Sequence, residues 1–302
     1  MAVERTVCVS GATSQVGAFL LPRLRAAGFE VLALSRAAPE PARAAGGLCW
    51  MQPREFFAGA APSRMTCLVS CGPLELALRI VDSTPGLQRV VAFSSSSVLS
   101  KADSASAAER SAMAALAVAE RELREACARR GLPLLLLRPT LIYGCGRDRN
   151  VSLLAAIARR FGLIPLAGPA GGLRQPVHAD DLAALSVQAL QAHEPADLLS
   201  PACGGDTIAY REMARRIAAA VPRRVRLLTV PEALLAGAVR AMARYPRWQG
   251  LDPEMVRRQN RDLVFDDSPL RQALPWNPRP FTPKPADFEL PPQAQALQPP
   301  PS

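Results

Sequence analysis

The sequence lacks the features that mark membrane-spanning, secreted and metal-binding proteins. No apolar run in its 302 residues is long enough to cross a bilayer, and Glu4 and Arg5 stand where a signal peptide would be apolar. Its cysteines are odd in number and scattered, without metal-ligand spacing, so we expect free thiols and no metal site. They are Cys8, Cys49, Cys67, Cys71, Cys127, Cys145 and Cys203. A reduced, cytoplasmic protein without membrane insertion is the simplest interpretation.

Lysine is scarce as well, because Lys101 and Lys284 are the only two in the chain. The formal net charge of +10 therefore comes almost wholly from arginine. These arginines occur as singles and pairs, without the long basic stripe and interleaved aromatic residues of a nucleic-acid-binding surface. We expect solvated helix faces and no specific nucleic-acid binding. A hydrophobic content of 49% and a charged content of 21% are ordinary for a globular protein.

The first forty residues have the pattern of a dinucleotide-binding strand, turn and helix. A short β-branched run at residues 7–10 leads into Gly11, and apolar residues then recur at helical spacing from Val16 to Leu24. Gly11 permits a tight turn, and Gly17 permits the helix to pack close to the strand. The helix N-terminus offers N–H groups and a positive dipole end to a pyrophosphate. Ser14 replaces the middle glycine of the usual motif, so the pattern is imperfect.

A second parallel strand follows Gly28 and ends at Ser35 and Arg36. NAD-binding units place an acidic residue at this strand end to bind the ribose 2′-hydroxyl, whereas arginine suits a 2′-phosphate. The sequence therefore favours NADP(H) over NAD(H). The alternative is that Arg36 is only a solvated charge at a strand end.

Further apolar runs alternate with helical patterns, which predicts a Rossmann-type, doubly wound parallel α/β sheet with helices on both faces. The predicted strands are residues 48–50, 65–71, 88–93 and 132–139, and the main predicted helices are residues 74–81 and 105–130. We expect a dinucleotide-binding domain at residues 1–150 and a smaller α/β substrate-side lobe at residues 151–282, interleaved with the first. Residues 283–302 are rich in Pro, Gln and Ala and are expected to be a disordered tail.

Five segments, in order along nearly the whole chain, resemble the extended short-chain dehydrogenase/reductase family, the NAD-dependent epimerase/dehydratase group, in an atypical branch. They are residues 11–17 (Gly-Ala-Thr-Ser-Gln-Val-Gly), 93–98 (Phe-Ser-Ser-Ser-Ser-Val), 137–144 (Leu-Arg-Pro-Thr-Leu-Ile-Tyr-Gly), 174–182 (Arg-Gln-Pro-Val-His-Ala-Asp-Asp-Leu) and 276–279 (Trp-Asn-Pro-Arg). Together these segments are specific to the superfamily, but they do not identify a substrate.

The resemblance implies a set of site residues. The expected cofactor-binding residues are Gly11, Thr13, Ser14, Gln15, Val16, Gly17, Ser35, Arg36, Cys71, Gly72, Ser94 and Pro139. Arg147 and Arg174 stand where sugar-nucleotide enzymes of the family contact phosphate, so they are expected to bind substrate. Ser95, Ser96 and Tyr143 are the candidate catalytic residues. The serines could instead only cap loops, and Tyr143 could only pack its ring. His178 is interpreted as a residue that starts a helix rather than as a base.

The family's usual catalytic pair, Tyr-x-x-x-Lys, is absent. The corresponding helix, residues 111–120, contains neither residue, and no tyrosine of the chain is followed four positions later by lysine. Two hypotheses follow. The first is an NADP(H)-dependent oxidoreductase or epimerase/dehydratase-like enzyme acting on an unidentified small molecule, with nucleotide-linked substrates among the candidates. The second is a non-catalytic NADP(H)-binding protein that acts structurally or as a redox sensor through a protein partner. The helix at residues 105–130 could form a homodimer or simply cover its own sheet.

Overall fold

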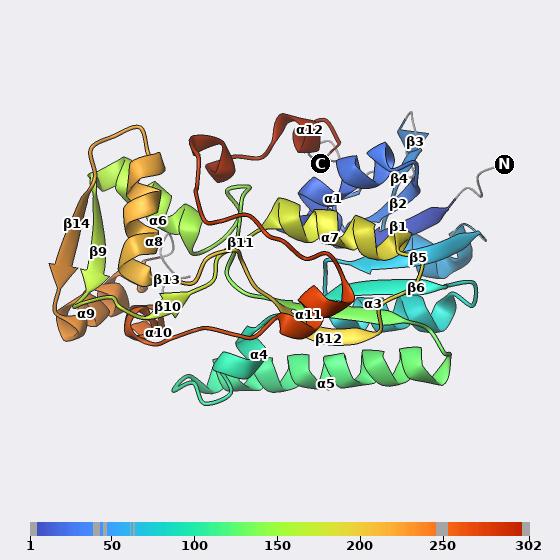
Figure 1. The fold of residues 1–302 in the computed structure, drawn as a ribbon, viewed down its shortest axis with the longest axis horizontal. Helices are drawn as coiled ribbons and strands as arrows, with labels where there is room; N and C mark the ends of the chain where they lie inside the picture. Colours follow the sequence, from blue (N-terminus) through green and yellow to red (C-terminus); the bar gives the residue numbers. More distant parts are fainter. Residues whose placement is uncertain are drawn as a thin grey trace.

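A mostly parallel sheet forms the centre of the protein (Figure 1). The computed structural model describes residues 5–38, 43–44, 47–60, 62, 64–245 and 253–297. In spatial order the sheet contains β12 (Leu198–Ala202), β7 (Leu134–Pro139), β6 (Arg89–Phe93), β5 (Met65–Ser70), β1 (Thr6–Ser10), β2 (Glu30–Leu34), β4 (Leu48–Met51) and β3 (Arg43–Ala44). All neighbours pair in parallel except β3, which is antiparallel to β4. The Rossmann-type fold predicted from the sequence is confirmed.

The strand order reverses at β1, which places a ligand-binding crevice at its carboxyl end. The chain proceeds outward from β1 through β2 and β4 on one side, and through β5, β6, β7 and β12 on the other. The last residue of β1, Ser10, pairs with Leu34 of β2 and with Ser70 of β5, so these three strands end side by side. In open α/β sheets, ligands bind outside the carboxyl ends of the strands at such a switch point.

Helices cover both faces of the sheet, and each face has its own apolar core. On one face α1 (Gln15–Ala26) packs beside α7 (Ala179–Gln191), and on the other α3 (Leu74–Ser83) packs beside α5 (Ala107–Arg129) (Figure 1). The strands are buried on both sides because helices lie above and below them, which explains their nearly continuous apolar sequences. No helix among the described residues is long and apolar enough to cross a membrane.

A smaller lobe lies at the far end of the molecule from the chain's N-terminus (Figure 1). It is built from α6 (Val151–Phe161), β9 (Leu163–Ala167), α8 (Tyr210–Ala220), β14 (Arg226–Val230), α9 (Glu232–Met242), α10 (Pro253–Arg257) and η3 (Arg258–Asn260). Strand β14 pairs in parallel with β9. Between these segments the chain returns to the large domain to form α7 and β12, so the lobe and the large domain are interleaved.

Short paired segments connect the two parts of the molecule. Strand β8 (Ile142–Tyr143) pairs with β11 (Val177–His178), and β10 (Leu173–Arg174) pairs with β13 (Ile208–Ala209). The serine-rich segment after β6 forms the one-turn helix α4 (Ser97–Ser100). After β4 the chain forms α2 (Pro53–Glu55) and η1 (Phe56–Ala60). Between β2 and β4, residues 43–44 form β3, and residues 39–42 and 45–46 lie outside the described residues.

The C-terminal segment differs from the disorder expected of it. After α11 (Ser268–Ala273), the chain forms η4 (Pro285–Phe288) and α12 (Pro292–Gln295). Phe288 joins the apolar core of the small lobe, and α12 packs against α1 with Ala294 only 1% exposed. The stretch contains few apolar residues, so its composition predicts disorder. Two of those residues, Phe288 and Ala294, nevertheless pack against the small lobe and against α1. Residues 298–302 lie outside the described residues.

Candidate functional site

The turn between β1 and α1 is compact because two glycines let backbone segments approach closely. Gly11 has a φ of +65°, and a Cβ atom there would lie 2.5 Å from the backbone nitrogen of Gly72. A Cβ atom on Gly17 would lie 2.4 Å from the carbonyl oxygen of Ala12. Ser14 caps α1 through its hydroxyl, which accepts a hydrogen bond from the Gly17 N–H at 3.1 Å. The first turn of α1 is therefore held against the carboxyl ends of β1 and β5.

Two buried polar atoms at this edge of the sheet lack hydrogen-bond partners among the described residues. They are Gln15 Nε2, at the start of α1, and Ser94 Oγ, directly after β6. Buried polar atoms in native proteins nearly always have a partner, and one without a partner calls for a ligand or water. The glycine turn, the N-terminus of α1 and these two atoms together fit a dinucleotide whose pyrophosphate lies at the helix end.

The other expected cofactor residues also lie along this edge. Thr13 Oγ1 is 3.4 Å from Ser35 Oγ, which also accepts a hydrogen bond from the Ala37 N–H at 3.2 Å. Arg36 is exposed and forms no ion pair with the described residues. Its side chain is therefore available to a ligand at the end of β2.

Cys71 and Pro139 shape the edge without offering reactive groups. Burial raises the pKa of the Cys71 thiol to about 12, although a hydrogen bond with Ser14 opposes the shift, so the thiol is protonated at neutral pH. The Pro139 carbonyl accepts a hydrogen bond from the Ser96 N–H at 3.1 Å, which ties the serine loop to the end of β7. Val16 is 4% exposed and packs into the core beneath the turn.

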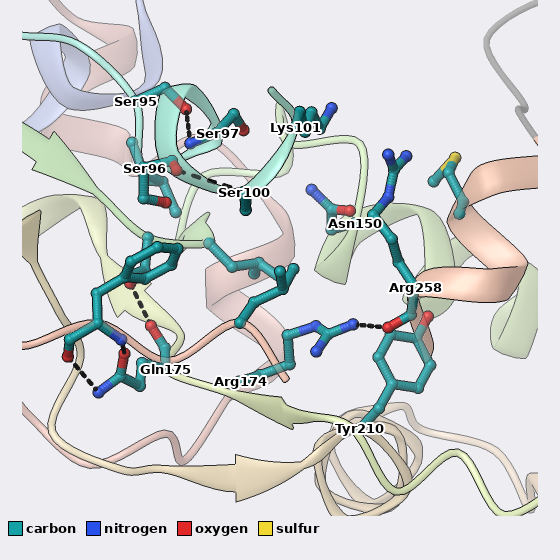
Figure 2. Close-up of a pocket in the computed structure, with 16 residues that line it drawn as sticks. Ser95, Ser96, Ser97, Ser100, Lys101, Asn150, Arg174, Gln175, Tyr210 and Arg258 are labelled. Carbon is teal, nitrogen blue, oxygen red and sulfur yellow. Dashed lines mark hydrogen bonds between the residues drawn. The ribbon is translucent and has the colours of Figure 1, made fainter. Parts of the chain in front are cut away.

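A polar pocket of about 260 Å³ lies between the serine loop and the small lobe. In Figure 2 the serine loop and α4 form one wall, Asn150 and Arg258 lie at one side, and Arg174 and Tyr210 lie opposite the serines. We call this cavity the site pocket. Its lining residues are Ser95, Ser96, Ser97, Ser100, Lys101, Thr140, Leu141, Ile142, Asn150, Arg174, Gln175, Tyr210, Met255, Arg258, Leu263 and Phe265. Three sequence-predicted residues, Ser95, Ser96 and Arg174, therefore come together here.

The two candidate serines differ in their surroundings. The Ser95 hydroxyl accepts a hydrogen bond from the Ser97 N–H at 3.1 Å, which leaves its own proton free to be donated to a bound ligand. Ser96 is 8% exposed, and its carbonyl accepts a hydrogen bond from the Ser100 hydroxyl at 3.5 Å. The loop thus orders itself through local bonds and still presents hydroxyl groups to the pocket (Figure 2).

Arg174 lines the site pocket, but its guanidinium is largely committed to the backbone. Nη1 donates to the carbonyls of Leu173 and Arg261, both at 2.7 Å, and Nη2 donates to the Arg258 carbonyl. Burial lowers the pKa of Arg174 to about 10, which still leaves it charged. The guanidinium also lies over the Tyr210 ring at 5.5 Å from the ring centroid. Arg174 therefore holds the pocket floor together and contributes positive charge, with little hydrogen-bonding capacity to spare.

Sequence reasoning missed an ion cluster at the pocket wall. Glu109 of α5 accepts hydrogen bonds from Lys101 Nζ at 2.8 Å, from the Ser104 hydroxyl at 2.7 Å and from Arg258 Nη1 at 2.9 Å. Burial opposes ionisation of Glu109, but the bonds from Lys101, Ser104 and Arg258 outweigh it and lower its pKa to about 2. Arg258 is 149 residues from Glu109, so no local sequence pattern could have paired them.

Tyr143, which the sequence offers as a candidate catalytic residue, lies in the interior of the protein. It is 1% exposed and packs edge-on against His178 and Phe281, with ring centroids 4.9 Å and 4.8 Å away. Burial raises the pKa of its phenol far above the ordinary value. This corrects the expectation of a catalytic tyrosine and favours the alternative that Tyr143 packs its ring. His178 begins α7 as expected, because its Nδ1 accepts a hydrogen bond from the Asp180 N–H at 3.0 Å.

Arg147 also differs from its expected place. It does not line the site pocket; it is exposed, and its Nη1 donates to the carbonyl oxygen of Thr13. The side chain therefore reaches across to the glycine turn, on the cofactor side of the crevice. A cation at this point suits the phosphates of a dinucleotide better than the phosphate of a substrate in the pocket.

Comparison with known proteins confirms the predicted resemblance. Residues 73–198 match the model of the NAD dependent epimerase/dehydratase family. No curated protein matches the chain. Among solved structures, MoeE5 in complex with UDP-glucuronic acid and NAD has a TM-score of 0.70 at 18% identity, covering 94% of this chain and 97% of that one. UDP-N-acetylglucosamine 4-epimerase from Bacillus cereus has a TM-score of 0.69 at 13% identity, covering 95% and 96%. At these identities the two structures show that the fold is shared.

Proposed function

We propose that the chain is an oxidoreductase or epimerase/dehydratase-like enzyme that prefers NADP(H) and acts on a small molecule held in the site pocket. The observation that carries this proposal is the close-packed glycine turn with two unpartnered buried atoms, Gln15 Nε2 and Ser94 Oγ, at the carboxyl edge of the sheet. The family match over residues 73–198 is a second support, because the glycine turn and Gln15 lie outside that segment.

The chain's own groups bind the cofactor and orient the substrate. When bound, the nicotinamide ring accepts or donates a hydride. The N-terminus of α1 binds the pyrophosphate, and Arg147 adds a cation beside it. Ser95 and Ser96 hold the reacting oxygen of the substrate by donating hydrogen bonds. Tyr210 also lines the pocket, but burial raises its pKa to about 12, so its phenol stays protonated.

The preference for NADP(H) rests on Arg36. Strand β2 ends at Leu34, and Ser35 and Arg36 follow it directly. The test is calorimetric titration with NADPH, NADP⁺, NADH and NAD⁺, first on the native chain. Arg36→Ala should weaken NADPH binding about 10- to 100-fold, since a charge-assisted hydrogen bond contributes about 1.5–3 kcal/mol. NADH binding should be almost unchanged. Arg240→Ala, which removes an exposed arginine from α9, is the matched control. Equal losses for NADPH and NADH would refute the 2′-phosphate assignment.

One observation favours a second function, a non-catalytic NADP(H)-binding protein. The helix that normally carries the Tyr-Lys pair is α5, and its residues at 111–120 include neither. Tyr143 cannot substitute, because it is buried away from the site pocket. A general acid or base contributes about 10²–10⁴-fold to a rate, so its loss permits either slow chemistry or none. Micromolar NADPH binding with little affinity for NADP⁺, and no turnover across a substrate screen, would support the redox-sensing function instead.

The proposal includes a homodimer formed through α4 and α5. Leu99 on α4 is 50% exposed and Val118 on α5 is 39% exposed, so both side chains would lose contact with water if these helices packed against a second copy. Sedimentation equilibrium tests this part. Leu99→Glu combined with Val118→Glu should convert a dimer to a monomer, whereas a monomeric native chain would remove the dimer from the proposal.

A further inference from the structure

A second cavity, of about 280 Å³, opens beside the site pocket within the small lobe. It lies among α6, α9 and α10, and we call it the apolar cavity. Its lining residues are Asn150, Leu153, Leu154, Ile157, Phe161, Leu163, Pro165, Tyr210, Leu235, Ala238, Val239, Met242, Met255, Val256 and Gln259. Three of them, Asn150, Tyr210 and Met255, also line the site pocket, so the two spaces share a wall.

The two cavities differ sharply in charge. Among the residues that the structure describes, Lys101, Arg174 and Arg258 line the site pocket, whereas no charged side chain lines the apolar cavity. The carbonyl end of the polar Gln259 side chain is already engaged, because its Oε1 accepts a hydrogen bond from the Ala167 N–H at 2.8 Å. The other polar side chains in the described lining belong to Asn150 and Tyr210, and both stand at the shared wall.

This lining does not suit a nucleoside diphosphate. Moving an ionised group into an apolar space without a counter-charge is strongly unfavourable, and the described lining of the apolar cavity offers a diphosphate no cation. The cations of the site pocket would attract the anionic group of a ligand into the site pocket and not into the apolar cavity. The described residues therefore separate a polar, positively charged space from an apolar one.

We infer that the substrate is amphiphilic, with an anionic or strongly polar head in the site pocket and an apolar tail in the apolar cavity. This inference rests on the proposed function, because the head is the part presented to the serine loop and the cofactor. Lys101 and Arg258 together carry two positive charges against the single negative charge of Glu109, and Arg174 adds a third cation at the floor. The surplus of positive charge favours a carboxylate or phosphate head.

The first test is a calorimetric comparison of hexanoate and decanoate as probes. Each buried methylene contributes about 0.8 kcal/mol, or about fourfold in affinity. If the tail enters the apolar cavity, decanoate should bind at least tenfold more tightly than hexanoate. Decan-1-ol, which keeps the tail but lacks the charge, should bind more weakly than decanoate, and Arg258→Gln should reduce that difference.

A matched pair of variants on α9 locates the tail. Ala238→Phe fills the apolar cavity and should abolish the advantage of decanoate over hexanoate. Ala233→Phe adds the same ring to an exposed position of the same helix outside the cavity lining and should leave the advantage intact. Affinity independent of chain length, or equal losses in the two variants, would overturn the inference. So would UDP that binds more tightly than decanoate and displaces it.

The cofactor titrations separate this inference from the proposed function. A chain that binds NADPH but shows no dependence on tail length keeps the proposed function and loses the amphiphilic substrate. The opposite outcome is also possible: decanoate binds and is sensitive to Ala238→Phe but not to Ala233→Phe, while none of the four dinucleotides binds. The apolar cavity would then bind amphiphiles, and the proposed enzyme function would be refuted.

Discussion

Replacing Glu109 by glutamine should both destabilise the protein and remove part of its acid sensitivity. Glu109 on α5 binds Lys101 at the end of α4 and Arg258 of the small lobe, so one carboxylate links three segments around the site pocket. The variant Glu109→Gln keeps the size of the side chain but removes its charge. Two cations then face each other without a common counter-ion.

The magnitude follows from the pKa of Glu109. The ion cluster lowers this pKa from the ordinary 4.5 to about 2. A pKa difference of one corresponds to about 1.4 kcal/mol, so a fully shielded cluster would contribute about 3 kcal/mol. The Glu109 side chain is 19% exposed and its partners reach solvent, so screening reduces the expected contribution to about 1–2 kcal/mol.

The direction of the pH dependence is fixed by the sign of the shift. Because the folded-state pKa is depressed, the stabilisation is fully present above pH 4.5 and is lost as the pH falls toward 2. About a quarter of it should be gone by pH 4. The assay is urea unfolding followed by tryptophan fluorescence, at pH 7 and pH 4, on the native chain and on Glu109→Gln. The native chain should exceed Glu109→Gln in free energy of unfolding by less at pH 4 than at pH 7.

Glu122→Gln is the control, since Glu122 is an exposed carboxylate on the same helix and no ion pair holds it among the described residues. It should change stability by less than about 0.5 kcal/mol at either pH. The reasoning would be refuted if Glu109→Gln lost no more unfolding free energy than Glu122→Gln. It would also be refuted if the loss in Glu109→Gln were the same at pH 7 and pH 4.

Two other substitutions test the site more directly. Gly17→Ala should reduce dinucleotide affinity at least 100-fold, because its Cβ would lie 2.4 Å from the Ala12 carbonyl and force α1 away from the turn, whereas Gly237→Ala on α9 meets no atom within 4 Å and should bind normally. Unchanged calorimetric affinity in Gly17→Ala would mean that the phosphates bind elsewhere. Tyr143→Phe should keep cofactor affinity and any turnover within about twofold, since the phenol packs between rings and does not line the site pocket. A loss of turnover of 100-fold or more, with affinity retained, would restore Tyr143 as a catalytic residue.

The sequence predicted the sheet well because the information for it is local. Most central strands are nearly continuous apolar runs between turn residues, and such runs are typical of parallel strands covered on both faces. The glycine turn is local too, since the strand, Gly11, Gly17 and α1 occupy one continuous stretch. The resemblance added the serine loop, whose Ser95 and Ser96 line the site pocket.

The parts that the sequence did not reveal depend on distant contacts. Arg147 and Arg174 are both arginines in matching segments, yet one reaches the Thr13 carbonyl and the other binds the carbonyls of residues 258 and 261. Composition cannot distinguish an arginine that binds substrate from one that satisfies backbone acceptors. The apolar cavity is equally hidden, because its helices α6 and α9 are separated by about 70 residues in the chain and their apolar faces predict only burial.

The missing catalytic pair and the apolar cavity both bear on how this site could catalyse a reaction. A Tyr-Lys pair transfers the substrate's proton and fixes the nicotinamide ribose, whereas this site pocket offers serine hydroxyls, a protonated Tyr210 and a Lys101 bound to Glu109. Serine hydroxyls orient an oxygen well but transfer protons poorly at neutral pH. Tight binding of an apolar tail could compensate in part, because binding energy from a remote part of a substrate can position its reacting end. Shortening the tail should then lower kcat as well as affinity, which distinguishes a tail used in catalysis from one used only for retention.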